Sequence, residues 1–156
     1  MAVERWVAGA VKSTFLSVFG TEINSIVNGN AILSSVLIDN SASPGDMFAQ
    51  VSVNLGSITS GAGAPYLGIF LYPLNGDAST YGDGRFGSSA AGPPPSSYWV
   101  SSIPLILSVT QAQEGTTGIF PIPFGKFKLV AYNASGATLA SGSNTIYLKT
   151  LNRQVA

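Results

Sequence analysis

The chain consists of short apolar segments, each closed within a few residues by glycine, proline, asparagine or serine. Residues 47–55 (MFAQVSVNL) are the clearest example, because apolar and polar side chains alternate along them. Such alternation is typical of a β-strand with one buried face. Two further strand-like runs, residues 126–133 and 144–150, flank a turn-rich stretch at 134–143. These patterns predict an all-β protein.

Four more segments have strand character. Residues 66–72 (YLGIFLY) form a continuous apolar run, which indicates a strand covered on both faces. Strands are also predicted at 31–39, 98–109 and 119–124, the last two at sheet edges because they contain proline. Residues 111–115 are predicted as a turn. About eight strands with long cross-connections favour a jelly-roll-like β-sandwich.

The N-terminal segment is patterned differently. Apolar residues recur at every fourth position, as on a helix, at Val7, Val11, Phe15 and Phe19. Glycine and β-branched residues among them lower the helix propensity. Lys12 and the Glu4–Arg5 pair disagree with a secretory signal. We therefore predict an extended arm or first strand over residues 1–20 and a single β-sandwich domain over residues 21–156.

A short helical turn is predicted at the start of that domain. Thr21 is placed to cap it, and Ile23, Ile26 and Val27 are expected to point inward. The Asn-Gly-Asn sequence at residues 28–30 then ends the segment with a strong turn signal.

Charged residues make up only 9% of the chain, against about 25% in a typical globular protein. Uncharged polar side chains can cover such a surface, or partners can bury it, and we expect both. The seven basic residues balance the seven acidic ones without a basic run, so no nucleic-acid binding is expected. No apolar stretch reaches the length of a membrane-spanning helix, so no membrane association is expected.

The residues that usually carry catalysis are scarce. Cysteine and histidine are both absent, which removes disulfides, the usual zinc ligands and the usual general base. Asp77 and Asp83 share one loop and offer oxygens to calcium, but such residues in glycine-rich loops are more often turn formers. The same pair has no defined separation for glycoside hydrolysis. We expect no enzyme activity, no metal and no cofactor, and a function in adhesion or assembly.

The long loop at residues 75–97 is the segment most suggestive of a binding role, because loops of this length are usually functional or disordered. Aromatic residues surround it, and they are interpreted either as sugar-stacking rings or as core and intersubunit anchors. Trp and Arg are enriched where interfaces are strongest. The candidate interface residues are Trp6, Phe15, Phe19, Tyr81, Arg85, Phe86 and Trp99.

Three long segments, in the same order, resemble a family of tailed-bacteriophage virion proteins. They are FGTEINSIVNGNAILSS at 19–35, followed by IDN at 38–40, then LYPLNGDASTYGDGRF at 71–86, and PIPFGKFKLVAYNASGATLASGSNTIYLKTLN at 121–152. The chain looks like the jelly-roll decoration, or cement, proteins of the phage capsid. The resemblance implies a homotrimer on the outer surface of the virion head. There it would bind the major capsid protein and stabilise the shell by bridging capsomers. The alternative is a tail or fibre module that binds a cell-surface glycan through residues 75–97.

Overall fold

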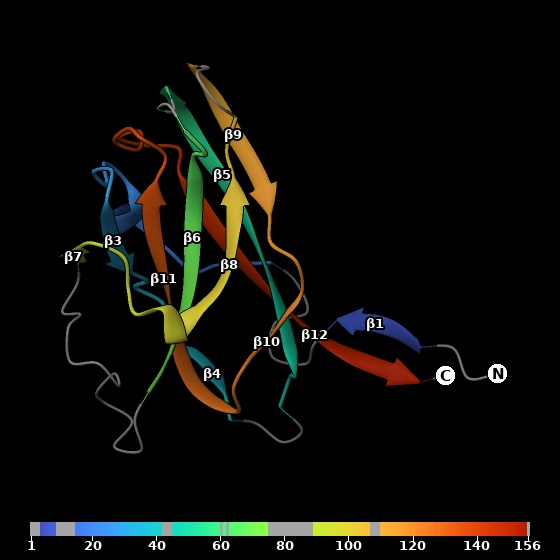
Figure 1. The fold of residues 1–156 in the computed structure, drawn as a ribbon. Coiled ribbons are helices and arrows are strands. Elements are labelled where there is room, and N and C mark those ends of the chain that lie inside the picture. Colours follow the sequence, from blue (N-terminus) through green and yellow to red (C-terminus); the bar gives the residue numbers. More distant parts are fainter. Residues whose placement is uncertain are drawn as a thin grey trace.

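The computed structural model describes residues 4–8, 15–41, 45–59, 61, 63–74, 89–106 and 110–155. Regular structure within these residues consists of β-strands and two short 3-10 turns, η1 (Thr21–Ile23) and η2 (Ser96–Tyr98) (Figure 1). The strands are β1 (Glu4–Ala8), β2 (Leu16–Ser17), β3 (Asn30–Leu33), β4 (Ile38–Asn40), β5 (Phe48–Thr59), β6 (Tyr66–Pro73), β7 (Ser89–Ala91), β8 (Trp99–Pro104), β9 (Thr110–Thr116), β10 (Phe120–Pro121), β11 (Gly125–Ala134) and β12 (Thr145–Val155). No helix in this part of the chain has the length and hydropathy to cross a membrane.

The described strands form two antiparallel sheets of six strands each. In the first sheet, β5 pairs with β12 on one edge and with β9 and β10 on the other, and β12 continues to β1 and β2. In the second, β11 pairs with β6 on one edge and with β3 and β4 on the other. The outer strands of this sheet are β7, beside β3, and β8, beside β6.

The chain changes sheet at most of its connections. It crosses between β2 and β3, β4 and β5, β5 and β6, β8 and β9, β10 and β11, and β11 and β12. Three pairs of short strands each share one edge of a longer strand, namely β1 with β2, β3 with β4, and β9 with β10. When each pair is counted as one position, each sheet has four main positions, and β7 is an additional strand beside β3. This arrangement confirms the predicted jelly-roll-like β-sandwich of about eight strands.

The core lies between the two sheets, where every second residue of the facing strands points inward. The inward residues of the four central strands are Ala49, Val51, Val53 and Leu55 on β5, Leu67, Ile69 and Leu71 on β6, Phe127, Leu129 and Ala131 on β11, and Ile146 and Leu148 on β12. Burying each larger side chain is worth about 1.5–3 kcal/mol. The alternation predicted for residues 47–55 is therefore confirmed from Ala49 onward. It is wrong for Met47, which precedes β5 and is exposed.

A smaller cluster covers the outer face of the second sheet. It consists of Ala31, Leu33, Phe70, Tyr72 and Val130. The ring of Tyr98, from η2, packs over Tyr72 with 4.4 Å between the ring centroids. Because β6 is buried on its inner face as well, the prediction of a strand covered on both sides is confirmed.

Three strand predictions are corrected. Residues 31–39 are two strands, because the chain leaves the edge of β11 at Ser34, whose hydroxyl donates to the carbonyl of Val36. Residues 111–115 lie in β9 rather than in a turn, and their polar side chains suit an exposed edge strand. The strand predicted at 119–124 is reduced to β10, since Pro121 and Pro123 have no N–H to donate.

The predicted helical turn at residue 21 is present as η1. Gly20 is its N-cap residue and no side chain caps it, so the capping role predicted for Thr21 is wrong. Ile23 and Ile26 are buried as expected, whereas Val27 is exposed. Val27 lies beyond η1, in the turn that leads to β3.

The predicted N-terminal arm has two parts. β1 pairs with the end of β12, from Glu4 with Val155 to Ala8 with Leu151, and this two-stranded ribbon projects from the sandwich (Figure 1). The second part belongs to the sandwich itself, because Val18 and Phe19 are buried in its core. Residues 9–14, which join the two parts, lie outside the described residues.

Candidate interaction surface

Two large apolar side chains are exposed at the end of the sandwich where β5 begins and β10 ends. Met47 is 58% exposed and Phe124 is 70% exposed. The segments that carry them lie side by side, because the backbone N–H of Ile122 donates to the carbonyl oxygen of Met47 at 3.0 Å. The ring of Phe124 lies over Gly45, where an added Cβ would come within 2.9 Å of it. Apolar side chains are thus held at the surface by fixed backbone.

The side chain of Asn40 forms hydrogen bonds to both of these segments. Its side-chain nitrogen donates to the carbonyls of Asp46 and Pro123, both at 2.8 Å, and its oxygen accepts from the Asp46 N–H at 2.8 Å. The carboxylate of Asp46, itself buried, accepts from the Thr150 hydroxyl at 2.5 Å and from the Asn152 amide at 2.8 Å. This network, which we call the Asp46 network, connects β4, the start of β5, and β12.

A pocket of about 270 Å³ lies beside the segment that contains Pro121 and Pro123. It is lined by Leu71, Pro73, Ser97, Tyr98, Trp99, Val100, Pro121 and Pro123. The shared prolines make the pocket continuous with the segment that carries Phe124. We define the basal apolar surface as Met47, Trp99, Pro121, Pro123 and Phe124. Exposed apolar groups that gather near one pocket are typical of interaction sites.

Trp99 is anchored on one side and open on the other. Its ring meets Phe70 edge-on, with centroids 5.0 Å apart and planes at 86°, and meets Tyr66 at 6.1 Å and 75°. An added Cβ on Gly68 would lie 3.0 Å from the indole, so the glycine gives the ring its place on the sheet. The residue is still 42% exposed. A fixed, half-open aromatic ring of this kind suits an interface anchor.

The structure places three other predicted interface residues apart from this surface. Phe15 is exposed, and the amine of Lys149 lies 5.7 Å from its ring centroid. Phe19 is buried in the core, so its ring fills the sandwich. The backbone of Trp6 pairs with Arg153 in the projecting ribbon. Three candidates lie outside the described residues: Tyr81, Arg85 and Phe86.

Sequence reasoning missed Met47 and Phe124. Met47 was expected on the buried face of a strand, and Phe124 was expected within an edge strand. The Pro-x-Pro-Phe-Gly sequence at residues 121–125 was the available signal, because two prolines in five residues end strand pairing and turn the chain outward.

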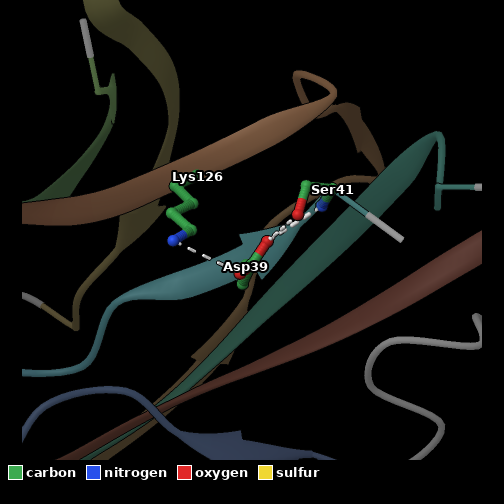
Figure 2. Close-up of polar contacts among 3 residues, drawn as sticks. All are labelled: Asp39, Ser41 and Lys126. Carbon is green, nitrogen blue, oxygen red and sulfur yellow. Dashed lines mark hydrogen bonds and ion pairs between the residues drawn. The ribbon is translucent and has the colours of Figure 1, made fainter. Parts of the chain in front are cut away.

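Charge contributes little to the basal apolar surface. Among the described residues, the ion pair that the structure holds is Lys126 with Asp39, at 3.7 Å between Nζ and Oδ2. Figure 2 shows that Asp39 also accepts hydrogen bonds from the hydroxyl and the backbone N–H of Ser41. These bonds, and to a smaller extent Lys126, lower the pKa of Asp39. Both partners are exposed, so the pair adds little stability.

The described part of the chain contains no cluster of metal-binding side chains. No three acidic side chains gather there in an arrangement that could hold an ion. Asp77 and Asp83, the pair considered for calcium, lie outside the described residues.

Comparisons with known proteins gave no match. Neither a scan of known protein families, nor a search of curated proteins, nor a search of solved structures found a similar one.

Proposed function

We propose that the protein is a capsid decoration protein of a tailed bacteriophage. It binds the outer surface of the head shell, contacts the major capsid protein and stabilises the shell by bridging capsomers. The observation that carries this proposal is the basal apolar surface, where Met47 and Phe124 are exposed on backbone fixed by the Asp46 network. The resemblance to decoration proteins supports the same reading.

The rigidity of this surface favours binding. Ordering side chains and loops on association costs free energy, so a surface that is already ordered retains more of its contact energy. Protein interfaces of standard size bury about 1,600 Å² in total. The basal apolar surface would form the apolar centre of such a contact.

Bridging requires that each oligomer of the decoration protein make more than one contact with the shell. A homotrimer presents three basal apolar surfaces, and a second contact made by the same trimer is intramolecular. Effective concentration then makes the combined binding much tighter than any single contact. The low charge content of 9% suits a chain that buries much of its surface in an assembly.

The glycan-binding alternative is placed on the loop at residues 75–97. Residues 75–88 of the proposed glycan-binding loop lie outside the described residues, so that alternative stays a prediction.

The test is binding to expanded phage shells that lack this protein. The double substitution Met47→Ser and Phe124→Ser should raise the dissociation constant for the shell about tenfold for each side chain removed. Burying a side chain of this size is worth about 1.5–3 kcal/mol. Ile106→Ser is the matched control, since Ile106 is 55% exposed but follows β8, away from the basal apolar surface. Equal occupancy for the double variant and the control would refute the proposal.

A further inference from the structure

A second pocket, of about 230 Å³, lies between η1 and β3. Its lining combines polar groups with apolar walls and includes Glu22, Asn24, Asn30, Ile26, Val27 and Ile32. We call it the Glu22 pocket. In Figure 1, η1 and β3 lie on the left of the sandwich, whereas the β1–β12 ribbon projects to the right. The elements that line the pocket and the ribbon of one copy therefore lie on opposite sides of the sandwich.

The Glu22 carboxylate makes this pocket anionic. Partial burial raises the pKa of Glu22, but hydrogen bonds from the Ser35 side chain and from backbone groups lower it by more, so the carboxyl stays ionised at neutral pH. One of these bonds runs from the Ser35 N–H to Oε1 at 2.7 Å. No described cation forms an ion pair with Glu22. An ionised carboxylate with apolar walls suits an arginine or lysine, whose aliphatic stem packs while its charged head pairs.

The rim of the Glu22 pocket shows two further features of a contact site. Ser25 has a φ of 58°, in the left-handed region that non-glycine residues rarely adopt. Its N–H donates to the carbonyl of Ala140 at 3.0 Å, which holds the conformation. Such strain is concentrated at functional sites. Val27 is 54% exposed at the same rim, where a partner would cover it.

The ribbon is the complementary element. Its two strands carry Arg5 and Arg153 against one acidic residue, Glu4, so its side chains sum to a net charge of +1. β5 pairs with β12 only up to Leu151, and the described residues provide no other partner for the ribbon. A two-stranded ribbon alone is marginally stable in water, and its free edges invite pairing with another chain.

We propose that the ribbon of one copy docks on a second copy of this chain, with Arg5 or Arg153 entering the Glu22 pocket. Because the pocket and the ribbon lie on opposite sides, the contact is head-to-tail. Head-to-tail contacts form a ring where the rotation closes. A ring of three would give the trimer expected of a decoration protein. The inference deepens the self-association in the proposed function and does not depend on shell binding.

The test is the oligomeric state of the purified chain, measured by sedimentation equilibrium over a range of concentrations. The wild type should associate. Glu22→Lys should raise the dissociation constant of self-association about 10- to 100-fold, as loss of a buried charge pair does. Of the two arginine variants, Arg5→Glu and Arg153→Glu, the one that removes the docking arginine should have the same effect. Combining Glu22→Arg with the disruptive glutamate substitution should restore much of the association, because the pair is then reversed. Glu114→Lys, at an exposed position on β9, is the control and should associate like the wild type.

Folding is checked by circular dichroism. If Glu22→Lys fails to fold, Glu22→Gln replaces it, because glutamine keeps an oxygen acceptor for the Ser35 N–H and removes only the charge. A monomeric wild type, or a folded charge variant that associates normally, would overturn the inference. Shell binding of the same variants separates the two proposals. A monomer that still binds shells leaves the shell contact of the proposed function standing but not bridging by a trimer, and an oligomer that does not bind shells leaves the docking of the ribbon standing.

Discussion

Gly61 and Gly136 pack backbone against backbone. A Cβ added to Gly61 would lie 2.8 Å from the Cα of Gly136, and one added to Gly136 would lie 2.5 Å from the Cα of Gly61. The N–H of Gly61 also donates to the carbonyl of Ser135 at 2.7 Å. This contact joins the chain beyond β5 to the turn between β11 and β12.

Gly136→Ala should therefore lower the free energy of unfolding by more than about 2 kcal/mol, since the new methyl meets backbone and the φ of 81° already costs about 1–2 kcal/mol. Urea denaturation measures the change. Gly63→Ala separates the two effects, because Gly63 has a positive φ and no neighbour within 4 Å of the added carbon. Gly118→Ala has neither problem and should be close to neutral. Equal losses at Gly136 and Gly63 would argue against a steric role for the glycine contact.

Removing the Asp46 carboxylate should destabilise the basal end of the sandwich. Asp46→Ala leaves the Thr150 hydroxyl and the Asn152 amide without this acceptor. Hydrogen bonds to a charged group are worth about 1.5–3 kcal/mol each, so a loss of about 3 kcal/mol or more is expected in urea denaturation. Asp39→Ala is the matched control and should change little, because Asp39 is exposed. Similar losses for the two variants would contradict the importance of the Asp46 network.

Acid should destabilise the wild type more than a Glu22→Gln variant. The pKa of Glu22 is lower in the folded chain than the ordinary glutamate value of 4.5. A carboxyl of this kind contributes stability that is fully present above pH 4.5 and is lost as the pH falls through the folded pKa. Melting temperatures measured from neutral pH down to about pH 3 should therefore converge for the two proteins at the acidic end. A constant difference across this range would show that Glu22 titrates normally.

The two parts of the N-terminal segment should behave differently when each is altered. Phe19→Ala should cost about 3–5 kcal/mol of folding stability, because Phe19 is in the core. Deleting residues 1–8 removes β1 and leaves the core intact, so the melting temperature should change little while self-association weakens. Sedimentation and thermal denaturation measure the two effects. Full self-association of the truncated chain would remove the ribbon from the contact.

Local sequence predicted the central strands well, because their side chains face a continuous core. The alternation at β5 and the apolar run at β6 follow directly from one and two buried faces. β9 carries the polar sequence TQAQEGT, and its strand conformation depends on pairing with β5. A pairing between distant segments leaves no mark in a polar edge strand, which explains why this segment was predicted as a turn.

The basal apolar surface was predicted only in Trp99. Met47 and Phe124 come together because Asn40 reaches across 83 positions of the chain to the carbonyl of Pro123. Such a hydrogen bond depends on the complete fold and cannot be read from the residues around either apolar side chain. The roles expected of Tyr81, Arg85 and Phe86 stay predictions.

The register of β1 on β12 makes Glu4 and Val155 direct partners. A short linker could therefore join the two described ends, and the chain could be reopened in the turn at residues 135–144 without interrupting any described strand. A circular permutant of this kind would keep the sandwich while exchanging the chain ends of the ribbon for a closed loop. For the same reason, peptides attached at Glu4 and at Val155 would leave the fold at one place, the end of the ribbon.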